Sequence, residues 1–230
     1  MAPFFILDSK SHSASFHMEK DALLLENLKK DTTPILRFYE FERPSFTYGH
    51  FTNLKTLLNL EEVQSLGLDF AKRPTGGGIT FHMSDFTFSV LIPKNHEGFF
   101  QNTLKNYAYI HEKVAKALSK VFQKKFSFLM EENKDSLGEG FCSAKPTKYD
   151  LLLSTKKVCG AAQRKKEWGY LHQGSIFLAP IEPYFLKDLF LDDRIEDQMK
   201  QNCHYLVELK ELSEYKRAIK NSLTDVFLNG

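Results

Sequence analysis

The feature that most constrains the fold of this chain is how closely its predicted strands follow one another. Residues 79–82 and 86–92 both have strand character, and so do residues 149–153 and 157–161, with three residues between the members of each pair. A parallel pair needs a crossover of about a dozen residues or more, so the members of each pair cannot be parallel partners. Because helical segments separate other strands, the sequence predicts an α+β domain with a mixed sheet, and not a doubly wound parallel fold.

Four segments have helical character, the clearest being the one in which apolar residues recur at three- and four-residue steps over residues 101–122. The other three are residues 13–30, residues 53–66 and most of the region 183–230. Gly67 marks the expected end of the second helix, since glycine is common just after a last helical turn. Further strands are expected at residues 35–39, 45–49, 68–73, 126–130 and 170–179, and a loop at residues 131–148.

Length and composition indicate an ordinary globular protein. A chain of 230 residues that is 42% hydrophobic can bury a full core, and we expect one domain over residues 1–230. The net charge of +2 argues against a nucleic-acid partner, which usually requires a strong basic excess or a basic face. No signal peptide is visible and no run approaches the roughly 18 apolar residues of a membrane span, so we expect a cytoplasmic protein with no membrane association.

The three cysteines are therefore expected to be reduced, and each is either a small buried hydrophobe or a nucleophile. Cys159 lies on a predicted strand, which favours packing, and Cys203 lies in a helical region with only His204 beside it. Cys142 lies in the predicted loop. Its position alone leaves an inert thiol and a nucleophile equally open.

Consecutive glycines at Gly76, Gly77 and Gly78 separate two predicted strands. Such a loop can present backbone N–H groups to an anion or a carbonyl, or it can be only a tight turn. It is not a phosphate-binding loop of the Walker type, because no Lys-Ser or Lys-Thr follows it. Arg73, at the preceding strand end, could pair with a carboxylate or phosphate held there, or it could be a surface arginine. His82 closes the next strand and is more often a structural hydrogen-bonding residue than a catalyst.

A second group of residues could line the same site. Lys157 begins a stretch of small apolar neighbours, where its ammonium could polarise a carbonyl or stabilise a thiolate; the alternative is a charged hairpin turn. Gly174 interrupts an apolar strand between His172 and Ser175, which indicates a bulge or a close backbone approach. Together with the glycine loop, these residues outline an extended ligand groove.

In this order and spacing, the segments resemble the lipoate–protein ligase A and lipoyl/octanoyl transferase family, which is related to biotin–protein ligases. The resemblance covers residues 14–180. Its motifs are Arg73-Pro74-Thr75-Gly76-Gly77-Gly78 with His82, then Lys157-Val158-Cys159-Gly160-Ala161-Ala162-Gln163-Arg164, then His172-Gln173-Gly174-Ser175. Each motif alone is weakly specific, whereas their combination is specific.

The resemblance implies a catalytic domain with a large and a small β-sheet flanked by helices, and a ligand tunnel between the glycine-rich strand and the lysine strand. It implies that Lys157 contacts the carbonyl of the bound acyl group. The residues that it implies for substrate binding are Arg73, Thr75, Gly76, Gly77, Gly78, His82, Gly160, Ala161, Gln163, His172, Gly174 and Ser175.

Two activities share this framework in the family. Ligases use ATP and Mg²⁺ to make lipoyl-AMP, whereas octanoyltransferases take the octanoyl group from acyl carrier protein, and one branch does so through a cysteine thioester. Cys142, eight residues before Asp150, stands where that branch carries its nucleophile. The resemblance therefore implies a cofactor-free acyl transfer, with Cys142 and Lys157 catalytic, to lipoyl domains of 2-oxoacid dehydrogenases or to the glycine cleavage H protein.

Two alternatives stay open on the sequence. An ATP-dependent lipoate–protein ligase would use the same groove, with Cys142 incidental. Departures from the family pattern, such as Lys72 and Ala161, would also fit a non-catalytic protein that binds carrier or lipoyl domains. We predict no metal site, because no Cys-x-x-Cys pair exists and the His111-Glu112 pair has alanine at position 115, where a zincin-type helix needs histidine.

Overall fold

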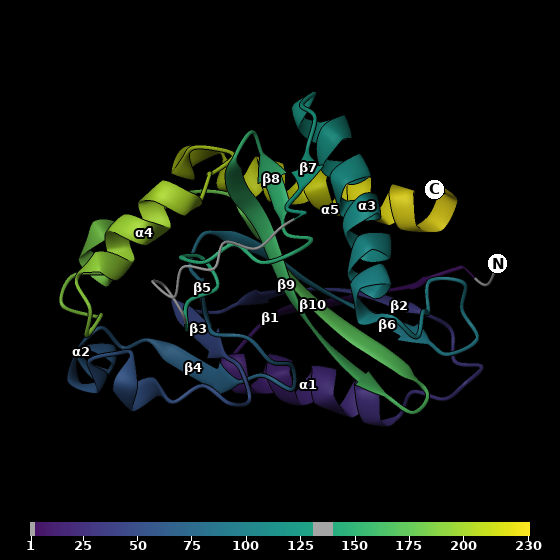
Figure 1. Cartoon of the computed structure of the whole chain (residues 1–230), viewed down its shortest axis with the longest axis horizontal. Helices are drawn as coiled ribbons and strands as arrows, with labels where there is room; N and C mark the ends of the chain where they lie inside the picture. The colour runs from purple at the N-terminus through teal and green to yellow at the C-terminus, as the bar shows by residue number, and fades with distance from the viewer. Residues whose placement is uncertain (1–2, 131–139) are drawn as a thin grey trace.

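The computed structural model describes residues 3–130 and 140–230, in which two β-sheets are surrounded by helices (Figure 1). Seven strands of this part form a large sheet in the order β1-β2-β6-β10-β9-β8-β7, and three form a small sheet in the order β4-β3-β5. The predicted α+β class with a large and a small sheet is confirmed. The first half of the predicted loop 131–148, residues 131–139, lies outside the described residues.

The large sheet is mixed, as predicted. Its strands are β1 (Phe5–His12), β2 (Ile35–Phe41), β6 (Asp85–Pro93), β7 (Ser127–Phe128), β8 (Leu151–Leu153), β9 (Lys156–Lys166) and β10 (Gly169–Phe177). Strands β1 and β2 are parallel and are connected through helix α1 (Ala14–Glu26), and the other neighbours are antiparallel. Sequence reasoning misses β1, because its second half is polar and lacks a buried face.

One of the two close strand pairs is a hairpin and the other is a change of sheet. Strands β8 and β9 pair antiparallel across a tight turn at Ser154, which has a φ of 58°. Strand β5 (Ile79–His82) instead belongs to the small sheet, whereas β6, which begins three residues after β5 ends, belongs to the large sheet. The short connection between β5 and β6 therefore joins the two sheets closely at one point, and the site described below lies between them.

The main core lies on the face of the large sheet that is covered by helices α3 (Thr103–Phe122) and α5 (Leu212–Asn229) (Figure 1). Alternation along β6 predicts that its even-numbered apolar residues share a face, and all four belong to this core: Phe86, Phe88, Val90 and Ile92. Leu91 points to the other face and packs with Leu25 of α1 and Leu171. The amphipathic pattern of α3 thus decides which face of the sheet it covers.

A second core holds the small sheet, whose other strands are β3 (Ser45–Tyr48) and β4 (Asp69–Lys72), against helices α2 (Leu60–Ser65) and α4 (Arg194–Asn202). The helix predicted over residues 53–66 is divided into a 3₁₀ turn at Leu54–Thr56 and α2. The break occurs because Leu58 forms a β-bridge with Phe190, after which the Asn59 side chain caps α2 as a new helix.

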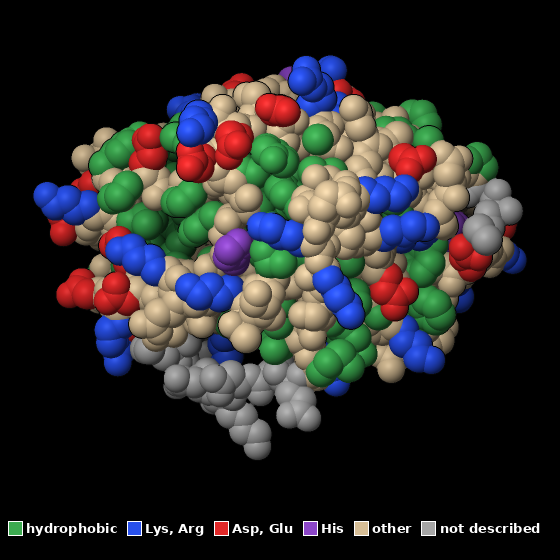
Figure 2. Space-filling model, turned by 90° about the horizontal axis from the view of Figure 1, so that it is seen from above, with side chains coloured by type: hydrophobic (Ala, Val, Ile, Leu, Met, Phe, Trp, Pro, Cys, Tyr) green, Lys and Arg blue, Asp and Glu red, His purple; other side chains and the backbone are tan. Residues whose placement is uncertain are grey.

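The region after Pro183 is largely helical, as predicted: a 3₁₀ turn at Pro183–Phe185 precedes α4, and an extended stretch with a second 3₁₀ turn at Leu209–Glu211 separates α4 from α5. Within that stretch Cys203 forms a β-bridge with Lys157, and His204 N–H donates to the Lys157 carbonyl at 2.8 Å. This contact fixes the start of β9. None of the helices in the described part of the chain is both long and apolar enough to cross a membrane. Figure 2 shows one face of the molecule, on which basic and acidic side chains are interspersed.

Candidate active site

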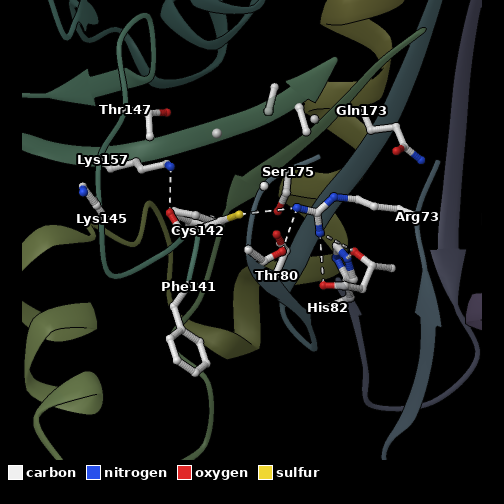
Figure 3. Close-up of a pocket in the computed structure, with 18 of the residues that line it drawn as sticks. Arg73, Thr80, His82, Phe141, Cys142, Lys145, Thr147, Lys157, Gln173 and Ser175 are labelled. Carbon is white, nitrogen blue, oxygen red and sulfur yellow. Dashed lines mark hydrogen bonds between the residues drawn. The ribbon is translucent and has the colours of Figure 1, made fainter. Parts of the chain in front are cut away.

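A cavity of about 290 Å³ lies between the two sheets, and Cys142 is part of its wall (Figure 3). The segment that carries Cys142 runs beside β5, because Cys142 N–H donates to the Ile79 carbonyl at 2.9 Å and Phe141 forms a parallel bridge with Ile79. Lys157, the second residue of β9, reaches the same place from the large sheet. Its Nζ atom donates to the Cys142 carbonyl at 2.7 Å.

Most of the residues predicted for the site line this cavity. They are Arg73, Gly77, Gly78, His82, Cys142, Lys157, Gly160, Ala161, Gly174 and Ser175. Four others do not line it. Thr75 donates through its hydroxyl to the Gln173 Oε1 atom at 2.8 Å, and the Gly76 carbonyl accepts from Arg73. Gln163 and His172 bond to each other and lie against α3, where His172 touches the rings of Tyr107 and His111.

Arg73 organises the glycine loop and carries a buried charge beside Cys142. Its guanidinium donates to the carbonyls of Gly76, Gly78 and Thr47 at 2.7–3.1 Å and reaches the Cys142 sulfur at 3.6 Å. Within the described ranges no acidic side chain forms an ion pair with Arg73. A buried cation without a counter-ion favours an anion next to it, and the nearest group that can become one is the thiol.

The Cys142 thiol is accordingly biased toward the thiolate. Burial alone would raise its pKa, but the charges of Arg73 and Lys157 outweigh burial, aided by hydrogen bonds from the Thr80 hydroxyl and the Gly78 N–H, so the pKa lies below the ordinary value. The other two thiols behave in the opposite way. Burial raises the pKa of Cys203 to about 12 and raises the pKa of Cys159 still further. The predicted packing role of these two matches their burial in the structure.

Lys157 is held by a buried ion pair that no single motif reveals. Its Nζ atom lies 2.7 Å from Asp150 Oδ2, and both side chains are almost fully buried. Burial would lower the pKa of Lys157, but Asp150 and a thiolate at Cys142 raise it, so the ammonium form is kept. Gly160 makes room for this arrangement, because a Cβ atom there would lie 2.5 Å from the Lys157 Cε atom.

The wall of the cavity beside Lys157 carries only small side chains. Gly160, Ala161 and Ala162 follow one another on β9, and Gly174 faces Ala161 across the β9–β10 pair. A larger side chain at Gly160 would collide with Lys157, and one at Gly174 would collide with the ring of Phe88 in the main core. The combination of a small, apolar wall with a few convergent polar groups is typical of a site for a mainly apolar ligand.

A polar network on the α1 side holds the opposite wall. Gln173 donates to Asp21 Oδ2 at 2.7 Å and accepts from Thr75, so it connects helix α1 to the glycine loop. Asp21 in turn forms a fully buried ion pair with Arg37 at 2.7 Å. Next to it, His82 bonds to Thr47 and Asp85, and Asp85 accepts from Ser175 at 2.6 Å.

Several lining residues escape the sequence reasoning. Four of them carry a detectable signal, because each lies two positions from a predicted site residue on the same strand and therefore shares its face: Thr80, Ala162, Gln173 and Phe177. The others reach the cavity from elements without such a register: Met18, Tyr39, Thr47, Gly140, Phe141, Lys145 and Thr147. Their side of each element is decided by packing between the two sheets.

This fold and this site are those of an acyl-group enzyme, and the comparison with known families agrees. The chain belongs to the lipoyl protein ligase A/B catalytic domain family, whose model matches residues 13–222. The predicted family is thereby confirmed, and the chain is an enzyme, as predicted, and not a non-catalytic binder.

Among its relatives, octanoyltransferase LipM of Bacillus subtilis (strain 168) is 30% identical over 233 residues, which cover 97% of this chain and 83% of that protein. Two solved structures share the fold. Lipoate-protein ligase A bound with ATP superposes with a TM-score of 0.75 at 17% identity, covering 97% of this chain and 85% of that one. The bi-partite lipoate protein ligase of Thermoplasma acidophilum, described with its E2 lipoyl domain, has a TM-score of 0.73 at 17% identity, covering 99% and 83%.

The charges around Cys142 predict selective alkylation of this thiol. In the native protein at neutral pH, iodoacetamide should modify Cys142 and leave Cys159 and Cys203 intact, because only Cys142 has a lowered pKa. As the pH rises, the rate should reach half of its maximum below the ordinary thiol pKa of about 8.5. Peptide mapping by mass spectrometry measures both, with Cys142→Ser as the control. Equal labelling of all three thiols would contradict the assignment.

Proposed function

We propose that this enzyme transfers an octanoyl group from acyl carrier protein to the lysine of a lipoyl domain, through a thioester on Cys142. One observation carries the proposal: a thiol biased toward its anion lies in the wall of a cavity whose neighbouring surface is small and apolar. The similarity to octanoyltransferase LipM supports the acyl group and the class of reaction. The neighbour described with its E2 lipoyl domain supports the class of acceptor.

In the first half-reaction, the Cys142 thiolate attacks the carbonyl carbon of the octanoyl thioester. A new carbon–sulfur bond forms to Cys142, the bond to the carrier sulfur breaks, and the carrier leaves as a thiol after taking up a proton. The Lys157 ammonium, which donates to the backbone carbonyl of Cys142, is a fixed positive charge beside this point, so it stabilises the oxyanion of the tetrahedral intermediate. Arg73 keeps the nucleophile ionised from the other side.

In the second half-reaction, the neutral amine of the acceptor lysine attacks the carbonyl of the octanoyl-Cys142 thioester. The amide bond forms, the Cys142 thiolate leaves, and the amine loses a proton to solvent or to the leaving group. The positive charges that lowered the pKa of Cys142 also make it a better leaving group, since a weakly basic thiolate departs more readily. The same electrostatic arrangement therefore serves both steps without a cofactor.

The ligase alternative uses the same cavity. Lipoate-protein ligase A, a protein of the same fold, is bound with ATP in its structure. Arg73 and Lys157 would then have to hold an acyl-adenylate. The contacts of Arg73 argue against that use, because its guanidinium donors already bond to Gly76, Gly78 and Thr47. Phosphate binding would require Arg73 to give up those bonds, and the glycine loop would then lose the contacts that hold it in place.

Acylation of Cys142 is the direct test of the thioester. Incubation of the native enzyme with octanoyl-carrier and no acceptor should add the mass of one octanoyl group, located at Cys142 by peptide mapping. Cys142→Ser and Cys142→Ala should lose both the adduct and the transfer. Cys159→Ala is the matched control and should keep the adduct, because its thiol packs in the core. Full transfer activity in Cys142→Ala would show that the thioester mechanism is wrong.

Lys157→Met should lower kcat by about 10²–10³-fold, the usual effect of removing one oxyanion donor. Lys156→Met is the matched control, since this neighbouring lysine is exposed and its ammonium donates to the Lys200 carbonyl on the surface. The loss of Lys157 also leaves Asp150 buried without its partner, which destabilises the fold. The double variant with Asp150→Asn removes that charge, and it should regain thermal stability while staying inactive. A recovery of kcat in the double variant would exclude an oxyanion role for Lys157.

Competition between donors decides between transferase and ligase. With one lipoyl-domain acceptor, octanoyl-carrier without ATP should modify the acceptor lysine, because the thioester itself supplies the activated acyl group. Free lipoate with ATP and Mg²⁺ should give neither modification nor pyrophosphate. The measurement is the mass of the acceptor together with a pyrophosphate assay. Modification that occurs only with ATP would establish the ligase in place of the transferase.

A further inference from the structure

A buried polar cluster lies behind the catalytic wall, on the face of β9 and β10 that is covered by α3. His172 accepts from, or donates to, the Gln163 side-chain amide at 2.8 Å, and its ring contacts the ring of His111 edge-to-face with centroids 5.1 Å apart. Both histidines are fully buried. Neither Nε2 atom has a hydrogen-bond partner in the part of the chain that the structure describes. The proposed mechanism uses none of these groups.

The contacts determine how the two rings are protonated. Burial lowers the pKa of both histidines, so both rings are neutral at neutral pH. His111 Nδ1 lies 2.5 Å from the Tyr149 carbonyl, which can only accept, so Nδ1 carries the proton and Nε2 is an acceptor. With the Gln163 Nε2 amide donating to His172 Nδ1, the proton of His172 is on Nε2. Within the described residues the two Nε2 atoms are not bonded to each other, and the rings meet through their edge-to-face contact.

The carbonyl that His111 holds belongs to a strained turn. Tyr149 has a φ of 70°, in the left-handed region that a bulky residue rarely adopts and that costs energy to maintain. The next residue is Asp150, the partner of Lys157. The turn also places Asp150 Oδ2 within 2.6 Å of the Thr147 N–H and 3.0 Å of its hydroxyl, so the carboxylate position depends on the turn conformation.

We propose that His111 is a positioning residue for the acyl-transfer site: from helix α3 it holds the Tyr149 carbonyl, keeps the left-handed turn in place, and thereby fixes the Asp150 carboxylate that orients Lys157. His172, supported by its bond to Gln163, packs edge-to-face against the His111 ring and so helps to hold that ring in place on α3. This assigns a role to two of the four predicted site residues that lie outside the cavity. The kinetic part of the inference rests on the proposed function.

Three variants separate this role from mere core packing. His111→Leu removes the donor and should lower kcat about tenfold with KM for the carrier within twofold, because one hydrogen bond no longer offsets the strain of the turn. His111→Asn should stay within about twofold of the native kcat, because its amide replaces Nδ1. Tyr149→Gly added to His111→Leu should restore most of kcat, since glycine adopts a positive φ without support. If His111→Leu does not fold, His111→Gln, whose amide matches Nε2, replaces it.

Asn106→Leu is the matched control on the same helix. Asn106 is fully buried, its Oδ1 atom accepts from the Phe100 N–H, and none of its hydrogen bonds within the described residues reaches the turn at Tyr149. It should lower the thermal midpoint as His111→Leu does, with kcat within twofold of native. An equal fall of kcat in Asn106→Leu and His111→Leu, or the absence of rescue by Tyr149→Gly, would overturn the positioning role.

Two measurements require neither an acyl donor nor a lipoyl-domain acceptor. They therefore distinguish a failure of the proposed function from a failure of this inference. Ring-nitrogen chemical shifts should show the Nδ1–H tautomer for His111 and the Nε2–H tautomer for His172. Alkylation of Cys142 at neutral pH should be slower in His111→Leu and unchanged in Asn106→Leu, because a displaced Lys157 stabilises the thiolate less. The opposite tautomers, or equal alkylation rates in all variants, would refute the positioning role even if no octanoyl transfer is found.

Discussion

Positive charge converging on the Cys142 sulfur is the constraint on which the rest of the site depends. Arg73 and Lys157 are both buried, and a buried cation is costly unless anions or acceptors compensate it. Lys157 has Asp150 as a partner, whereas Arg73 has, among the residues described, only carbonyls, one threonine and the thiol. A thiolate at Cys142 therefore completes the charge balance of the fold. The form of Cys142 that the proposed mechanism requires is also the form that the folded structure favours.

The two sheets supply these charges from opposite sides. The glycine loop and Arg73 belong to the small sheet, Lys157 begins β9 of the large sheet, and Cys142 lies on a segment bonded to β5 (Figure 3). Backbone contacts join these parts: β5 and β6 are nearly continuous, and Lys157 accepts from His204 after α4. The distance between nucleophile and oxyanion donor thus depends on how the sheets are joined, so residues remote from the chemistry, such as His111, affect it.

Several parts of the site were predictable because they are local. The register of β9 and β10 follows from their hairpin, so the small residues of β9 and Gly174 of β10 come together once the strands are recognised. Period-two alternation likewise places Thr80 with His82. His172 and Gln163 show where such reasoning stops: their motifs mark the correct strands, but both side chains turn to the α3 face. A strand has two faces, and only packing decides which of them borders a cavity.

The sequence by itself determined the α+β class, the order of most elements and the family, and it singled out Cys142 and Lys157, the two residues of the proposed mechanism. These properties depend on periodicity, on short connections and on motif spacing, all of which are encoded within a few neighbouring residues. The tertiary structure alone decided that Arg73 bonds to the glycine loop, that Asp150 pairs with Lys157 and that His111 holds the turn before Asp150. Those contacts join segments that are distant along the chain or depend on a backbone conformation, and burial sets their strength, so no local pattern contains them.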